Sequence, residues 1–292
     1  MNKIDELKTQ YENIYASDQL KQNVNKILKR KKFPVFLKIT AAVAAFILSF
    51  TAFFNFFPNF AEAAAEIPVI GTLVRVITFG KYENKDQGYE AKIITPKIEG
   101  LLDKDLENRL NNDFKENAEE IIKAYENDVK ELKKEYGEET IHMGVASDYI
   151  IKTDTDRILS LDVYILYTAG SSSTKHTFYT IDKKTGKLLS LSGLFKNGAD
   201  YISPISEYIK EEMKRLNAEE DGLFWVNPEE DFFESFEKIK ENQNFYINDR
   251  CELVICFDKY EVAAGAQGCP EFVIPPDVIS SVVSPSSVIY KK

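Results

Sequence analysis

The chain has 292 residues and a mass of 33.4 kDa, enough for one or two domains, and its 44% hydrophobic content excludes a wholly disordered protein. With 37 basic and 47 acidic residues, the formal net charge of −10 argues against a nucleic-acid-binding protein, which needs a basic face. Three cysteines exclude a disulfide-stapled scaffold, and two histidines exclude a multi-histidine metal site.

The charge is distributed unevenly along the chain. Residues 1–38 contain nine Lys or Arg and four Asp or Glu, whereas residues 39–57 contain no charged residue. The rest of the chain therefore holds 28 basic and 43 acidic residues, a net charge of −15. An uncharged apolar segment thus separates a basic amino-terminal part from an acidic remainder.

Residues 1–35 are predicted to form a short cytoplasmic stub of two amphipathic helices. Apolar residues recur at steps of three and four, and Ser17-Asp18 between the two runs suits an N-cap. The stub is too short for a core of its own, so its apolar faces are expected to bind a groove on a partner protein. The alternative is a juxtamembrane helix that its lysines hold on anionic lipid. The residues expected to bind the partner are Leu7, Tyr11, Ile14, Leu20, Val24 and Ile27.

Residues 36–58 are predicted to form a single transmembrane helix. The uncharged segment Ile39–Phe57 would span about 28 Å as a helix, close to the ~30 Å hydrocarbon core of a bilayer. Five of the seven residues from Lys26 to Lys32 are basic, which predicts a plasma-membrane protein with a cytoplasmic amino end and an extracellular carboxyl-terminal domain. A cleaved signal peptide is the alternative, but its apolar region is shorter and preceded by fewer residues.

Residues 59–80 are the predicted juxtamembrane segment. Two overlapping A-x-A triplets within residues 61–65 resemble signal-peptidase sites, where shallow pockets require small residues. Ile67–Phe79 then has apolar residues at helical spacing, and two interpretations stay open. The segment is either an amphipathic helix on the outer membrane surface or the first buried element of the outer domain. The residues at which cleavage is expected are Ala61, Ala63, Ala64 and Ala65.

Two α+β modules, 81–195 and 196–292, are expected to form the extracellular domain. The first is predicted to contain a strand at 88–95, a long amphipathic helix over 102–136, and strands at 145–153, 158–167, 175–182 and 187–191. The second is predicted to contain helices at 201–216 and 231–241, and strands at 245–248, 252–257 and 271–275. This order predicts an α+β fold, in which antiparallel sheets pack against one long and several shorter helices.

No residue pattern in the outer domain indicates catalysis, a metal or a cofactor. The Ser/Thr-rich stretch 168–176 lacks the G-x-S-x-G pattern of many serine hydrolases and is expected to be a loop. Cys251, Cys256 and Cys269 have neither a CxxC spacing nor a histidine near them in sequence, so zinc is not expected. One disulfide, with Cys269 as a candidate partner, stays open, as do free buried thiols.

Two runs near the carboxyl end carry a family resemblance. Residues 244–263 read NFYINDRCELVICFDKYEVA, and residues 265–275 read GAQGCPEFVIP. They resemble the carboxyl-terminal domain of the anti-sigma-V factors, which also occurs in secreted and deacetylase-linked cell-wall proteins. The order of stub, span, A-x-A triplets and two α+β modules resembles this family over essentially the whole chain.

The resemblance implies a single-pass anti-sigma factor that sequesters an extracytoplasmic-function sigma factor through its stub and senses lysozyme outside the cell. Lysozyme binding would permit signal peptidase to cut within residues 61–65, and a site-2 protease would then cut within Ile39–Phe57 and release sigma. Neither the residues nor the resemblance implies an enzyme, a cofactor or direct contact with nucleic acid. The alternative is a membrane-anchored cell-wall binding protein or lysozyme inhibitor without a signalling role.

Two segments are the candidate lysozyme contacts, because exposed loops on a rigid sheet commonly carry recognition. The acidic outer domain is also expected to attract a strongly cationic protein such as lysozyme. The lysozyme-binding pattern of the resembling family has Pro and Tyr where this chain has Ala264 and Ala266, so an aromatic anchor is lost and a lower affinity is expected. The candidate contact residues are Ser171, Ser172, Ser173, Ala264, Gly265, Ala266 and Gln267.

Overall fold

The computed structural model describes residues 74–136, 142–226 and 233–290, which belong to one compact unit, Val69–Lys292. The predicted stub, the predicted span and the cleavage alanines lie outside the described residues. Within the described ranges, no helix is both long enough and apolar enough to cross a membrane.

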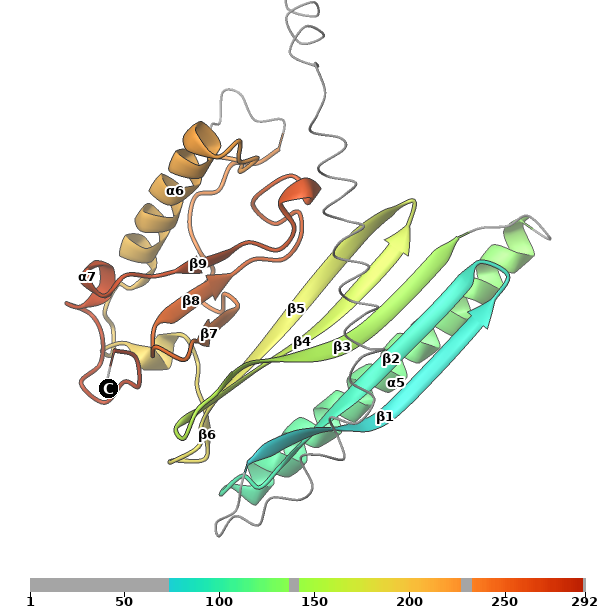
Figure 1. Ribbon diagram of the computed structural model, residues 1–292, viewed down its shortest axis with the longest axis horizontal. Coiled ribbons are helices and arrows are strands. Elements are labelled where there is room, and N and C mark those ends of the chain that lie inside the picture. Colours follow the sequence, from blue (N-terminus) through green and yellow to red (C-terminus); the bar gives the residue numbers. More distant parts are fainter. Residues whose placement is uncertain (1–73, 137–141, 227–232, 291–292) are drawn as a thin grey trace, which may run out of the picture. The chain divides into compact units, whose positions relative to one another are not determined.

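A six-stranded sheet, in the order β1-β2-β3-β4-β5-β6, forms the first half of the described unit (Figure 1). Neighbouring strands are antiparallel except for β2 and β3, which are parallel. The expectation of antiparallel sheets is therefore confirmed for every other neighbouring pair and wrong for this one. A parallel pair needs a long crossover connection, which the helix between β2 and β3 provides. The strands are β1 (Arg75–Asp86), β2 (Tyr89–Glu99), β3 (Met143–Asp154), β4 (Ile158–Ala169), β5 (Ser171–Asp182) and β6 (Lys187–Leu188).

Helix α5 (Lys104–Tyr136) confirms the predicted amphipathic helix. Asp103 caps its first turn, because the Asp103 Oδ1 atom accepts a hydrogen bond from the Leu106 backbone N–H at 2.9 Å. Its apolar stripe packs against one face of the sheet, where residues of β2, β3 and β4 complete two buried clusters. The buried residues of the helix are Leu106, Leu110, Phe114, Ala118, Ile121 and Tyr125.

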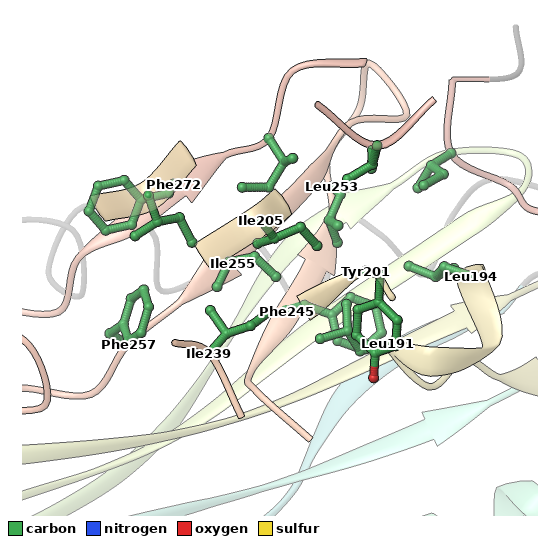
Figure 2. Close-up of a cluster of buried hydrophobic side chains, with 14 of the residues drawn as sticks. Leu191, Leu194, Tyr201, Ile205, Ile239, Phe245, Leu253, Ile255, Phe257 and Phe272 are labelled. Atoms are coloured by element: carbon green, nitrogen blue, oxygen red, sulfur yellow. The ribbon is translucent and has the colours of Figure 1, made fainter. Parts of the chain in front are cut away.

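The second half of the unit has a separate core around a three-stranded antiparallel sheet, β7-β8-β9. Figure 2 shows side chains from this sheet, from α6 and from the 3₁₀ turn at Ser192–Leu194 gathered in one cluster, with Ile205, Ile239 and Ile255 among them. The elements are α6 (Ile202–Glu219), β7 (Phe245–Ile247), β8 (Leu253–Cys256), a 3₁₀ turn (Gly265–Gln267), β9 (Glu271–Val273) and α7 (Pro276–Ile279).

Side chains from the two sheets meet on the face of the large sheet opposite α5. Thr153 Oγ1 and Ser160 Oγ both donate hydrogen bonds to the carbonyl of Ile247, at 2.7 and 3.1 Å. The Phe178 ring stacks on the Tyr246 ring with 5.7 Å between their centres. The two halves therefore share a packed junction in which β4 and β5 face β7.

Two predicted helices are wrong where the structure describes them. Residues 75–79 belong to strand β1, which pairs with β2, so this part of Ile67–Phe79 is the first element of the outer domain. Residues 233–241 contain no helix, although Phe236 and Ile239 are both buried at a helical spacing. Their backbone N–H groups donate instead to the Trp225 carbonyl and to Ser206 Oγ, which replace helical hydrogen bonds.

Candidate functional site

The structure places the predicted segment 171–173 against Lys259 and Tyr260, which lie in the same loop as the predicted segment 264–267. Ser171 Oγ lies 3.1 Å from the Tyr260 hydroxyl, and the Lys259 ammonium donates a hydrogen bond to Ser172 Oγ at 2.7 Å. We call this area the contact surface and define it as the hairpin tip 169–173 together with the loop 258–269. It joins the end of the large sheet to the loop between β8 and β9.

The serines lie in strand β5, so the prediction of a loop over 168–176 is wrong. Strands β4 and β5 pair continuously from Ala169 and Ser171 at one end to Ile158 and Asp182 at the other, and Gly170 with a φ of +69° makes the turn. Polar side chains here indicate exposure to solvent rather than an absence of backbone pairing. The contact surface is thus more regular than the sequence suggested.

Loop 258–269 is held by backbone contacts and by one close ring contact. Ala264 N–H donates to the Leu223 carbonyl at 3.0 Å, which anchors the loop beside the segment that follows α6. A Cβ atom on residue 265 would lie 2.4 Å from the Tyr260 ring, so glycine here leaves room for the ring. Ala266 and Gln267 remain exposed, whereas Ala264 and Gly265 are partly buried.

A buried Asp162–His176 pair lies beneath the contact surface. The two Asp162 carboxylate oxygens are 3.0 and 2.9 Å from His176 Nδ1, and the Asp162 side chain is only 2% exposed. The His176 backbone N–H donates to Asp258 Oδ1 at 2.8 Å, and its carbonyl accepts from Asn244 Nδ2 at 2.8 Å. The position of the imidazole is therefore fixed by both halves of the unit.

The environment makes this histidine a cation at neutral pH. Burial lowers the pKa of His176, but hydrogen bonds and charge from Asp162 and Cys269 outweigh burial and raise the pKa to about 10. Burial also raises the pKa of the Asp258 carboxyl, and the His176 N–H lowers it in part. Burial raises the pKa of Tyr164, whose ring centre lies 5.9 Å from that of His176.

The sequence interpretation missed Lys259, Tyr260 and the Asp162–His176 pair. A usable signal existed for Asp162, because it is the one charged residue in the otherwise apolar and hydroxyl-bearing strand ILSLDVYILY at 158–167. Lys259 and Tyr260 follow directly after the predicted strand at 252–257, where loop residues commonly carry recognition. The pairing of Asp162 with His176 required knowledge of the β4–β5 register.

The three cysteines are free thiols in the structure, with Cys256 buried and Cys251 and Cys269 partly buried. Across residues 74–136, 142–226 and 233–290, no three metal-ligating side chains gather in one group. The chemistry that the contact surface offers is hydroxyls, one ammonium group and one aromatic ring. Such a set suits recognition of a protein surface.

Comparisons with known proteins cover nearly the whole chain. Residues 82–171 match the family described as "Deacetylase PdaC", and residues 192–277 match "Protein of unknown function (DUF3298)". A DUF3298-family protein of Bacteroides fragilis has a solved structure that covers 74% of this chain and 96% of its own, with a TM-score of 0.54 and 15% identity, which shows the fold alone.

A second relative covers the amino-terminal part as well. The anti-sigma-V factor RsiV of Bacillus subtilis is 38% identical over 286 residues, which are 96% of this chain and 96% of that protein. A match to 96% of the chain extends through the apolar segment 39–57 and into both halves of the outer domain. The chain therefore belongs to the anti-sigma-V factor family.

Proposed function

We propose that this chain is a single-pass plasma-membrane anti-sigma factor that holds an extracytoplasmic-function sigma factor through residues 1–35. The observation that carries the proposal is the 38% identity to an anti-sigma-V factor over 96% of both chains. A relative that shared only the outer domain would support a cell-wall binding role equally well. Here the basic stub and the uncharged segment fall within the same alignment.

The proposed signal is lysozyme, which binds the contact surface outside the cell. The residues after the span carry a net charge of −15, which favours encounter with a cationic protein. Tyr260 is 44% exposed and supplies an aromatic side chain beside Ala264 and Ala266, where the lysozyme-binding pattern of the family has Pro and Tyr. Lysozyme contact is thus proposed to centre on Tyr260, Ala266 and Gln267.

The proposed output is cleavage in two steps. Signal peptidase cuts within Ala61–Ala65, and a site-2 protease then cuts within Ile39–Phe57 and releases the stub with sigma. Ala65 precedes the start of β1 at Arg75 by ten residues, so the cleavage segment adjoins the folded outer domain in sequence. Lysozyme can promote cleavage only if it binds more tightly to the state in which that segment is accessible.

Sigma binding is tested by co-purifying the full chain with extracytoplasmic-function sigma factors of its own organism. The paired change Tyr11→Asp with Ile14→Asp places charge on the apolar face of the predicted helix and should abolish co-purification. Thr9→Asp, on the polar face of the same predicted helix, is the matched control and should retain it. Failure of the unmodified chain to hold any such sigma factor would favour the cell-wall binding alternative.

Cleavage is tested in cells that express the full chain. Ala63→Trp combined with Ala65→Trp should block lysozyme-dependent release of the stub, because both triplets lose a required small residue. Ala64→Trp changes neither end of either triplet and should leave release intact. Continued release from the double variant would refute the placement of the cut.

A further inference from the structure

A surface cavity of about 490 Å³ opens in the second half of the unit, between residues 233–243 and the loop that follows β8. Small-molecule sites in proteins commonly have volumes of ~300–1,000 Å³. The cavity shares Tyr260 and Glu261 with the contact surface, whereas Trp225 and Phe233 line the cavity alone. The function proposed above gives this cavity no role.

Aromatic rings form part of the cavity wall. The centres of the Trp225 and Phe233 rings lie 4.6 Å apart, with 31° between the ring planes. Phe233 is 58% exposed and Tyr260 is 44% exposed, so both present apolar area to a ligand in the cavity. Removing aromatic area from water is favourable, which suits a ligand that has a flat apolar face of its own.

Polar groups around Glu261 form another part of the wall, and hydrogen bonds hold them in place. The Glu261 carboxylate accepts hydrogen bonds from the Lys240 ammonium group at 2.7 Å and from the Asp258 backbone N–H at 2.8 Å. Gln243 is 5% exposed, and its Nε2 atom donates to the same carboxylate at 3.3 Å and to the Cys256 carbonyl at 2.9 Å. The carboxylate is therefore positioned before a ligand binds, which lowers the entropy cost of binding.

The charged side chains around the cavity indicate the class of ligand. A cation would meet two ammonium groups and an anion would meet three carboxylates, whereas the hydroxyls of a neutral saccharide can donate to carboxylates and accept from ammonium groups. The C–H face of a sugar ring also packs closely on an aromatic ring. We propose that the cavity binds a neutral saccharide, which stacks one sugar ring on Phe233 and hydrogen-bonds with Glu261 and Lys240. The charged lining residues are Glu234, Glu237, Lys238, Lys240 and Glu261.

The single tryptophan of the chain, Trp225, lines the cavity, so its emission reports binding directly. The full chain, in micelles of a polyoxyethylene detergent that has no sugar headgroup, is titrated with cellotetraose and with chitotetraose. At least one of these neutral saccharides should change the emission in a saturable way, with a Kd that high salt does not alter, because the ligand has no charge. Choline and inorganic phosphate serve as the cationic and anionic probes. A saturable change with either ion but with neither saccharide, or no change with any probe, would overturn the proposal.

Changes at Phe233 test the stacking contact. Phe233→Leu retains an apolar side chain but loses the ring, so it should weaken saccharide binding by at least about fivefold. Phe233→Tyr retains the ring and should bind within about twofold of the unmodified chain. Phe79→Leu changes an exposed phenylalanine of β1, outside the cavity, and should leave binding unchanged.

Circular dichroism shows whether each variant is folded. In a folded Phe233→Leu chain, binding as tight as that of Phe233→Tyr would overturn the proposal. If Phe233→Leu does not fold, the titrations of the unmodified chain decide. The test uses neither sigma nor lysozyme, so it can fail while the proposed function stands.

Discussion

Replacing Asp162 with Asn measures how much the buried Asp162–His176 pair stabilises the fold. Both carboxylate oxygens lie within 3.0 Å of Nδ1, and the side chain is 2% exposed, so solvent screens the pair weakly. Loss of one partner from such a pair costs ~3–5 kcal/mol. Asn retains one oxygen acceptor for the ring N–H, so we expect the free energy of unfolding to fall by about 2–3 kcal/mol.

The raised pKa of His176 predicts how the stabilisation by the Asp162–His176 pair changes with pH. The pKa of His176 rises from 6.5 to about 10 in the folded protein, so the folded state binds the proton more tightly than the unfolded chain. The stabilising contribution is therefore complete below about pH 6.5 and is lost as the pH rises through about 10. The difference between the unmodified chain and Asp162→Asn should shrink over this range.

The assay is urea unfolding of the full chain in detergent micelles, followed by Trp225 emission at several pH values. Asp148→Asn is the matched control, because burial raises the pKa of that carboxyl and its hydrogen bond is to the backbone N–H of Tyr149. The control should lower the unfolding free energy by less than about 1 kcal/mol or increase it. Equal losses in the two variants, or a difference that stays constant up to pH 10, would refute the reasoning.

Three further changes test the helix cap, the core and the contact surface. Asp103→Ala removes the acceptor at the start of α5 and should lower the unfolding free energy by ~1 kcal/mol in urea titration. Ile205→Ala leaves a cavity at a fully buried position in the core shown in Figure 2 and should lower the free energy of unfolding by ~2–5 kcal/mol. A smaller loss than that of Asp103→Ala would contradict the burial of Ile205 in that core. Gly265→Ala should displace the Tyr260 ring and change the free energy of unfolding by less than about 1 kcal/mol. If Tyr260 anchors lysozyme as proposed, the same change should weaken lysozyme binding in calorimetric titration, and unchanged binding would argue against that role.

Elements with strong periodicity could be predicted from the sequence. The apolar stripe of α5 recurs over many turns, and its position depends on local spacing alone. The branched and aromatic residues at 145–153, 158–167 and 252–257 likewise predict strands, and the structure has β3, β4 and β8 there. Within the described residues of 88–275, the predicted order of elements is confirmed except at 168–176 and 233–241, and the sequence pattern does not predict strand β1.

The errors arise where tertiary contacts decide the local structure. Phe236 and Ile239 are spaced as on a helix, but an extended segment buries the same two residues against α6 and β8. Ser171 and Ser173 are exposed and Ser172 is partly buried at the end of a regular hairpin, where polar residues are compatible with strand pairing. The Asp162–His176 pair joins residues from two strands, so no local pattern in the sequence marks the pairing.

The two halves are joined partly through the backbone N–H and carbonyl of residue 176. These groups form the same hydrogen bonds with any side chain at that position. A different ring or an amide at position 176 would therefore leave the backbone hydrogen bonds to Asp258 and Asn244 in place. Among related chains, the chemistry of the side chain at this position can therefore change while the main-chain hydrogen bonds that join the two halves are retained.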